Sequence, residues 1–181
     1  MKQGAPVFLD ACCLINLLAT GRMEEIVHVL PYRFSLSRYV AEREVLRIDP
    51  PKEALAGPDD ELSELTDSSR ISVEDLESEE ELTMLVRFAM ILDDGEASIC
   101  ALAALRGGAV ATDDGKALRV LASWNPRIPI LQTPELLFEW AQRSRSSEED
   151  VRTVLRAVRD RARFLPRRQA PCAEWWWRHL P

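Results

Sequence analysis

Acidic side chains end or open several stretches of this sequence, and they could hold a divalent cation. Asp10 ends one apolar stretch, Asp113 and Asp114 end another, and Glu96 opens the helical stretch that leads into the second one. Carboxylates brought together would repel one another by several kcal/mol at low dielectric, and a bound cation removes that repulsion. Hard oxygen ligands select Mg²⁺ or Mn²⁺ rather than zinc. A metal ion held in this way can activate water against a phosphodiester bond.

Glu42 is a different kind of acid, because it lies one turn into a predicted helix rather than beside a strand. It shares one face of that helix with Tyr39 and Leu46, and we expect this face to point inward, towards a sheet. A carboxylate on a buried face needs a partner. Glu42 could therefore join the other acids on a metal ion, or it could pair with an Arg in the core.

Each of the other acids also has a purely structural interpretation. Asp10 and Asp114 could cap the helices that follow them, because Asp is a preferred residue at that position. Glu96 could be one more acid at a helix N-terminus, stabilised by the helix dipole. It is the combination of these acids in one regular order that favours a metal site over a series of separate caps.

The elements that must position the acids are short strands that alternate with helices. Such alternation predicts an α/β fold, with a parallel sheet, right-handed crossovers and helices on both faces. Ligand sites in these sheets form at the carboxyl ends of the strands, near the point where the strand order reverses. Strands are expected at 7–9, 33–36, 70–73, 109–112 and 128–131, a loop at 48–60, and helices at 14–18, 23–30, 37–46, 59–65, 78–90, 96–106 and 116–122.

Composition excludes several classes of protein. The 181 residues, 46% of them hydrophobic, suffice for one well-packed core and fall short of two full domains. The net charge is −7, and ten Arg against five acids in residues 141–181 give that part +5 and leave −12 for residues 1–140. Overall charge therefore does not favour nucleic acid. The longest uncharged run, residues 11–21, is too short for a membrane span, and with no recognisable signal peptide we expect a cytoplasmic protein.

The cysteines and histidines point away from zinc and from triad-type catalysis. The four cysteines form no CxxC pair, and neither His stands at zinc-ligand spacing, so we expect reduced cysteines in the core. With only two His in the chain, catalysis built on a Ser–His or Cys–His pair is poorly supplied.

Four segments of the sequence resemble, in order, the acidic motifs of PIN-domain nucleases, a family that includes the VapC-type toxins of toxin–antitoxin pairs. The segments are VFLDACCLINLL, YVAEREVL, LDDGEASICALA and VATDDGKAL, within a match that spans about residues 6–131. The resemblance implies a PIN-like three-layer sandwich with a central parallel sheet of about five strands and helices on both faces. The nuclease domain would cover 1–142, followed by an Arg-rich helical extension at 143–181.

The resemblance also implies roles for individual residues. The carboxylates that would hold the metal and carry out catalysis are Asp10, Glu42, Glu96 and Asp114. The family's Thr-x-Asp spacing favours Asp114 as the last metal ligand, whereas Asp113 lies nearer the strand end, so both are kept as candidates. Asn16 and Thr112 would lie beside the metal as polar groups.

Together, the acids and the resemblance predict a Mg²⁺- or Mn²⁺-dependent endoribonuclease, the toxin of a type II toxin–antitoxin system. Its partners would be an RNA substrate and a cognate antitoxin protein, with a homodimer as a further expectation and no membrane. The alternative is a non-catalytic PIN-like binding module that acts through protein or RNA contacts.

The C-terminal extension carries an amphipathic helix rich in Arg and a run of three tryptophans, 175–177. Such a helix can pack on its own domain, dock a second copy or an antitoxin, or contact RNA. The arginines that could contact RNA or a partner are Arg156, Arg159 and Arg163, and RNA contact could extend to Arg167 and Arg168. We expect the tryptophans to be a hydrophobic anchor, because three consecutive Trp cannot all face one nucleic-acid strand.

Overall fold

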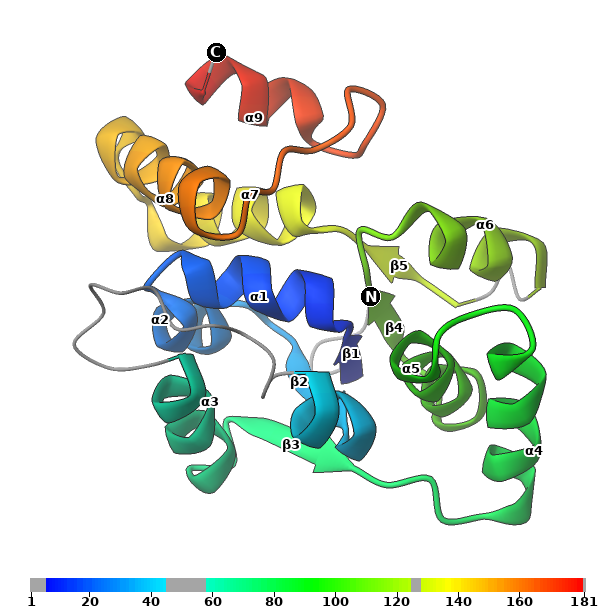
Figure 1. The fold of residues 1–181 in the computed structure, drawn as a ribbon. Helices are drawn as coiled ribbons and strands as arrows, with labels where there is room; N and C mark the ends of the chain where they lie inside the picture. The colour runs from blue at the N-terminus through cyan, green and yellow to red at the C-terminus, as the bar shows by residue number, and fades with distance from the viewer. Residues whose placement is uncertain (1–5, 45–57, 125–127, 181) are drawn as a thin grey trace.

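The computed structural model describes residues 6–44, 58–124 and 128–180, and its centre is a five-stranded sheet (Figure 1). All neighbouring strands run parallel, in the order β3-β2-β1-β4-β5. The predicted α/β three-layer sandwich is therefore confirmed. The strands are β1 (Pro6–Leu9), β2 (Arg33–Ser37), β3 (Ile71–Glu74), β4 (Ala109–Ala111) and β5 (Ile130–Leu131).

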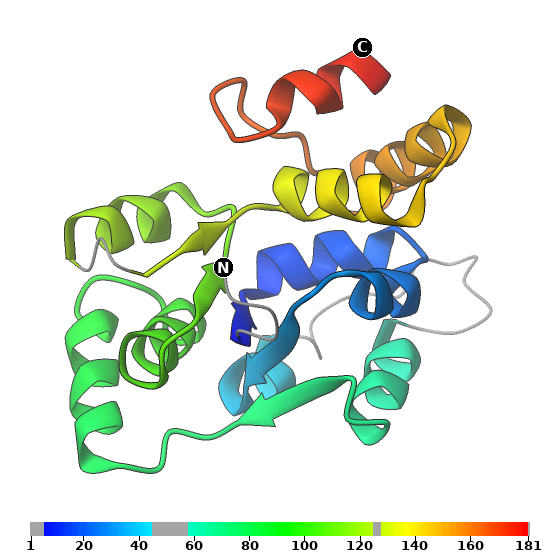
Figure 2. The same cartoon turned by 180° about the vertical axis from the view of Figure 1, so that it is seen from behind.

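Helices cover both faces of the sheet (Figures 1 and 2). On one face α5 (Asp94–Arg106) packs against β1, β2 and β4, with α4 (Glu79–Ala89) outside it. On the other face α1 (Ala11–Ala19), α2 (Met23–Val29) and α7 (Thr133–Ser144) pack against one another. Further helices are the π-helix η1 (Val40–Glu44), α3 (Pro58–Asp67), α6 (Gly115–Trp124), α8 (Glu148–Arg161) and α9 (Ala173–His179).

Continuous apolar sequence explains why β1 and α5 lie at the centre. Val7, Phe8 and Leu9 are all almost fully buried, because a parallel strand is covered on both faces. In α5, small and apolar side chains occur all round the helix, from Ala97 through the middle turns, and these too are buried. A helix of that composition is covered on every side, here by the sheet and by α4.

The strand order reverses between β1 and β4. From β1 the chain moves outward to β2 and β3, and it then returns through α4 and α5 to β4, on the other side of β1. Leu9 pairs with Ala111, so the next residues, Asp10 and Thr112, leave the sheet side by side. The first turn of α5 lies at the same edge, because a crossover helix runs antiparallel to the strands that it connects. This is the edge at which α/β sheets form ligand sites.

The C-terminal extension packs on the domain, with α8 against α1 and α9 against α7 and α8. Trp176 is fully buried and meets Phe164 edge to face at 5.6 Å, and Trp175 meets Phe138 in the same way at 5.5 Å. Of the three roles expected for this extension, the fold therefore displays one, packing on its own domain. The expected domain boundary at 142/143 falls inside the last turn of α7.

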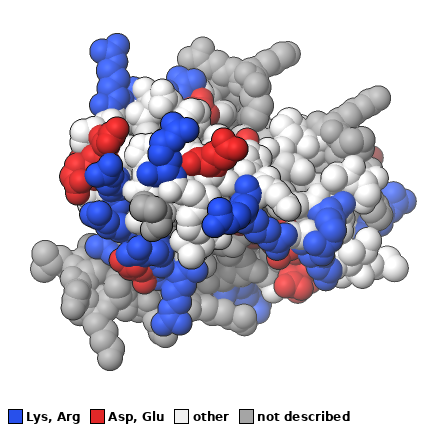
Figure 3. Space-filling model, turned by 90° about the horizontal axis from the view of Figure 1, so that it is seen from above, with Lys and Arg blue, Asp and Glu red and all other residues white. Residues whose placement is uncertain are grey.

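The basic face of the extension is interspersed with acids (Figure 3). On α8, Arg156 lies 3.5 Å from Glu149, and Arg159 lies 2.7 Å from Asp160. Arg163, just after α8, is exposed and adopts a left-handed backbone conformation. Two of the three arginines expected to contact RNA or a partner are therefore already ion-paired.

Some expected boundaries differ from the observed ones. The last strand is confined to β5 at 130–131, and α5 begins at Asp94 rather than at Glu96. The end of the expected loop at 48–60 is helical, since α3 begins at Pro58, while 45–57 lie outside the described residues. Within the described ranges, no helix has both the length and the apolar character needed to cross a membrane.

Candidate metal centre at the carboxyl ends of β1 and β4

Asp10 is a buried carboxylate held by three donors. It is 4% exposed and caps α1, with Oδ1 accepting from the backbone N of Ala11 at 2.8 Å. Its Oδ2 accepts from the hydroxyl of Thr112 at 2.7 Å and from the thiol of Cys12 at 3.0 Å. Burial raises the pKa of Asp10 in spite of these hydrogen bonds. The capping interpretation is therefore correct, but it does not account for the cost of burying the charge.

Glu96 faces the same place from the first turn of α5. Burial, and after it the negative charges of Asp10 and Asp114, raises the pKa of Glu96 to about 7. The mutual repulsion shows that these carboxylates lie within electrostatic range of one another. The helix dipole alone would have lowered the pKa of Glu96, so its environment is dominated by burial and by like charge.

Asp114 completes the group from the start of α6. Its Oδ1 accepts from the backbone N of Lys116 and of Ala117, at 2.5 and 2.9 Å, so this residue also caps a helix. Its own backbone N donates to the hydroxyl of Thr112 at 3.1 Å. Thr112 thus joins Asp10 to Asp114, in the place beside the acids that was expected for it. We call Asp10, Glu96 and Asp114 the carboxylate centre.

Asp113 has a different set of hydrogen-bond partners from Asp114. It accepts hydrogen bonds from the backbone N and the hydroxyl of Thr133, at 3.1 and 2.5 Å, and from Asn16 Nδ2 at 3.1 Å. The thiol of Cys13 donates to it as well, at 3.3 Å. These contacts tie the loop after β4 to α1 and α7. Of the two candidates for the last ligand, Asp114 is therefore the one that lies with the other acids, and Asn16 belongs to the Asp113 network.

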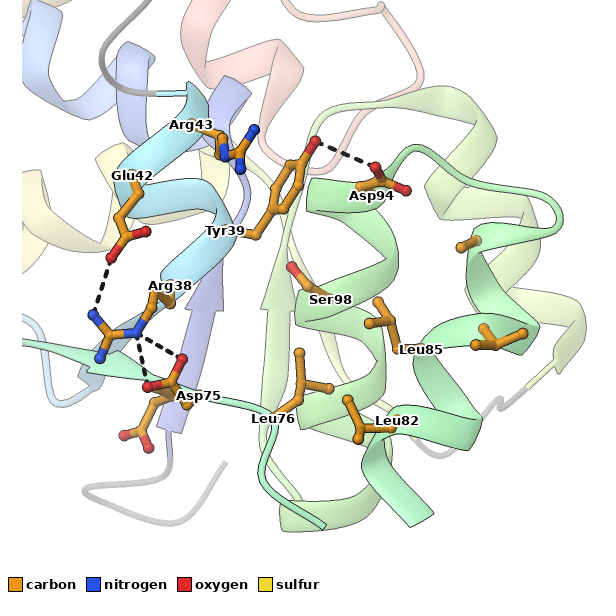
Figure 4. Close-up of a pocket in the computed structure, with 13 residues that line it drawn as sticks. Arg38, Tyr39, Glu42, Arg43, Asp75, Leu76, Leu82, Leu85, Asp94 and Ser98 are labelled. Atoms are coloured by element: carbon orange, nitrogen blue, oxygen red, sulfur yellow. Dashed lines mark hydrogen bonds and ion pairs between the residues drawn. The ribbon is translucent and has the colours of Figure 1, made fainter. Parts of the chain in front are cut away.

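The expected inward orientation of Glu42 is wrong. Its side chain is 59% exposed and pairs with Arg38 at 3.1 Å, away from Asp94 and the first turn of α5 (Figure 4). The chain from Val40 forms a π-helix, whose wider turn changes which residues face the sheet, and Val40 takes the buried position. Leu46, expected on the same face, lies outside the described residues.

The carboxylate centre has no ion-pair partner among the residues that the structure describes. Within residues 6–44, 58–124 and 128–180, no Lys, Arg or His nitrogen lies within 4.0 Å of its carboxylate oxygens. Its donor set consists of oxygens alone, and these suit Mg²⁺ or Mn²⁺. A cation held there would remove the repulsion that raises the pKa of Glu96.

A second group with metal-ligand chemistry lies next to the centre. Among the described residues, Cys12, Cys13 and Asp113 have ligand atoms that all lie within 4.8 Å of one another, a spacing that the oxygens of Asp10, Glu96 and Asp114 do not reach. The two cysteines donate their thiol hydrogens to Asp10 and Asp113, and burial raises the pKa of the Cys13 thiol. Metal ligation needs the thiolate. These contacts therefore favour protonated thiols that orient the carboxylates, as the expectation of reduced cysteines implied.

A groove of about 530 Å³ lies between η1, α4 and α5, and apolar side chains of α4 and four acids, Glu42, Glu74, Asp75 and Asp94, form part of its lining (Figure 4). Asp94 and Ser98, which flank Glu96 along α5, belong to its wall. Tyr39 donates its hydroxyl to Asp94 at 3.3 Å, and Arg43 reaches into the same region from η1. Tyr39 and Arg43 were not expected at the site. The sequence placed Tyr39 on the inward helix face with Glu42, and nothing in the spacing of Arg43 marks it as a groove residue.

No protein-family model, no curated protein and no solved structure matches this chain. What the motifs suggest about function therefore rests on the residues and on the geometry described above.

Proposed function

We propose that this protein is a Mg²⁺- or Mn²⁺-dependent endoribonuclease. The observation that carries the proposal is that Asp10 and Asp114 lie near enough to Glu96, at the reversal point of the sheet, for their charges to raise its pKa, while no Lys, Arg or His nitrogen of the described residues lies within 4.0 Å of these carboxylates. Three capping acids could each be explained alone. Their shared, uncompensated position is best explained by a metal ion, and metal-bound water is the usual nucleophile of phosphodiester hydrolysis.

The residues of the centre would divide the work. Asp10, Glu96 and Asp114 would hold the cation, which when bound supplies a polarised water and positive charge beside the scissile phosphate. Thr112 fixes Asp10 and the backbone of Asp114 in one arrangement, so that the ligands need little reorganisation. Cys12 adds a third donor to Asp10.

RNA as the substrate is supported by the PIN-like motifs and by two side chains of the groove between η1, α4 and α5. A groove with an aromatic ring and a guanidinium, here Tyr39 and Arg43, can take a single-stranded nucleic acid through stacking and phosphate contact. Such a substrate would be met in the cytoplasm, as expected from the sequence.

The experiment is a cleavage assay with a fluorescently labelled single-stranded RNA. We expect cleavage with Mn²⁺ or Mg²⁺, none in EDTA, and none with Asp10→Asn. Asp160→Asn is the matched control, because Asp160 is an exposed acid of α8 that pairs with Arg159. Cleavage that persists in EDTA or in Asp10→Asn would refute the metal mechanism.

A protein partner, such as the antitoxin of a toxin–antitoxin pair, is supported by a different observation. Leu82 and Val86, on the groove side of α4, and Met90, at the helix end, have exposed fractions of 48%, 63% and 82%. These residues are four apart and form one apolar stripe, the pattern that a partner helix can cover. The same stripe supports the alternative of a binding module. Calorimetry with Mn²⁺ separates the two, since a module that only binds partners would show no heat of metal binding that Asp10→Asn removes.

A further inference from the structure

Arg167, in the segment between α8 and α9, reaches back to the loop that carries Asp114. A Cβ built on Gly115 would lie within 2.8 Å of the Arg167 guanidinium, closer than packed atoms approach. Gly115 is buried, directly follows Asp114 and begins α6. Its backbone is not in the left-handed region, so a side chain at this position would meet the Arg167 guanidinium and would not strain the backbone. The guanidinium of Arg167 occupies the space that a side chain at position 115 would otherwise fill.

The segment that carries Arg167 is fixed on both sides. Pro166 is buried, and the backbone O of Arg167 accepts from the N of Ala170 at 2.9 Å in a tight turn. On either side of the turn, Phe164 and Trp176 pack edge to face. The backbone at Arg167 is therefore fixed by its neighbours. The position of the side chain against Gly115 follows from the packing of the extension.

The charge of Arg167 is not used by a carboxylate of the described residues, since none lies within 4.0 Å of it. This separates it from Arg156 and Arg159 on α8, whose charges are shared with neighbouring acids. Its side chain is also exposed. A guanidinium that is accessible, unpaired and beside an acidic centre is suited to bind a phosphate, which the acids themselves repel.

We propose that Arg167 binds a phosphate of the RNA substrate next to the carboxylate centre, in the space that Gly115 leaves open. This inference rests on the proposed ribonuclease function. It gives the C-terminal extension a role in the site, because the extension supplies positive charge that the acidic loop after β4 lacks. Arg167 acts on substrate binding and takes no part in the activation of water.

The first test is Arg167→Ala in the Mn²⁺-dependent cleavage assay. We expect KM to rise about tenfold and kcat to stay within about twofold, as for the loss of one charged hydrogen-bond pair. The slope of log KM against log salt should fall by about 1 in magnitude. Arg168→Ala is the control, since it removes the same charge one residue away, where the guanidinium lies over Trp177 at 5.7 Å. An unchanged KM, or an effect equal to that of Arg168→Ala, would overturn the proposal.

Gly115→Ala provides the second test, because its methyl group must displace the guanidinium. In the wild-type background we expect the same rise in KM as with Arg167→Ala. In an Arg167→Ala background it should have no further effect, since alanine is compatible with the first turn of α6. Additive effects of the two substitutions would contradict the proposed contact.

Binding measurements keep this inference separate from the proposed activity. The dissociation constant of the same RNA is measured by fluorescence anisotropy with Asp10→Asn, with and without Arg167→Ala. A tenfold loss of affinity on removing Arg167 supports the phosphate contact even if no cleavage is found. Cleavage without that loss overturns the contact alone, and a wild-type chain that neither cleaves nor binds RNA overturns both.

Discussion

The two ends of α5 shift the pKa of a nearby glutamate in opposite directions. At its C-terminal end Arg106 donates to Glu81 at 2.6 Å and to Glu74 at 2.8 Å, and the contact with Arg106 lowers the pKa of Glu81 to about 2. At its N-terminal end Glu96 has no such partner among the described residues, and burial with two like charges raises its pKa to about 7. Both glutamates lie in the first turn of a helix, so their position in the helix does not explain the difference.

The comparison separates acids that hold the fold together from acids that can hold a ligand. Glu81 also accepts from the backbone N of Glu77 and Ser78, so its charge is satisfied inside the protein. Glu96 is left with a charge that an external cation can use. A structural carboxylate therefore forms an ion pair with an Arg or Lys of the protein itself. Substitution of single residues can test this criterion.

The largest expected effect is on Glu96. Glu96→Gln should lower kcat for RNA cleavage by about 10²- to 10³-fold, because it removes one of three proposed metal ligands. Metal-free protein should not lose stability, since the neutral amide relieves the repulsion from Asp10 and Asp114. Cleavage kinetics, Mn²⁺ calorimetry and thermal unfolding in EDTA measure the three quantities. Full activity, or a marked loss of stability, would place Glu96 with the structural acids.

Glu81→Gln should show the reverse pattern. The substitution weakens a buried ion pair and a capping box, and we expect the free energy of unfolding to fall by about 2 kcal/mol. Urea unfolding measures this change. At a temperature where the variant is folded, kcat and Mn²⁺ affinity should match the wild type. A loss of Mn²⁺ binding without a loss of stability would remove the distinction between the two ends.

The pH dependence of stability should also differ between the ends. In metal-free protein the native state binds the Glu96 proton more tightly than the unfolded chain does, from an ordinary pKa of 4.5 up to about 7. The free energy of unfolding should therefore fall as pH rises through this window, by about 1 kcal/mol once solvent screening is included. The Glu81 contribution is lost instead as pH falls from about 4.5 towards 2.

Urea unfolding in EDTA from pH 5 to pH 8 measures this slope. Glu96→Gln should flatten it, and Mn²⁺ should restore stability more at pH 8 than at pH 5, because the cation needs ionised carboxylates. Asp10, whose pKa is also raised by burial, adds a contribution of the same sign. A slope that Glu96→Gln leaves unchanged would show that Glu96 is not the titrating group.

The smallest expected effect is on Glu42. Glu42→Gln should change kcat by less than about twofold and stability by about 0.5 kcal/mol or less, because an exposed ion pair such as the one with Arg38 contributes little. Like Glu81, this acid already has a cation of the chain as its partner. Kinetics and thermal unfolding beside Glu96→Gln give the comparison, and a large loss of activity would return Glu42 to the ligand set.

The strands and most helices were predictable because they depend on local pattern. The run Val7 to Leu9 and the helical spacing after it predict β1 and α1. Gly107, which follows the last residue of α5, marks the end of that helix. From alternation it followed that the acids after the strands would meet at one edge, and Asp10, Glu96 and Asp114 do. Glu42 failed because the prediction assumed an α-helix where the chain forms a π-helix.

The choice between Asp113 and Asp114 could not be made from sequence, since both follow the strand directly. It depends on Thr133 and Asn16, which come from α7 and α1 and draw Asp113 to one side. The Arg167 contact was equally hidden, because the only signal is a glycine after an aspartate. Neither partner is near the other in the chain.

The sequence by itself determined the class of fold, the chemistry of the acids and their order along the chain. These follow from periodicity and residue type, which act over a few neighbouring residues. The tertiary structure alone decided which acids have no ion-pair partner among the described residues, which aspartate raises the pKa of Glu96 and which arginine lies against Gly115. Those outcomes depend on long-range packing, because the charge on a carboxylate is stabilised or destabilised by whatever the fold brings within a few ångströms of it.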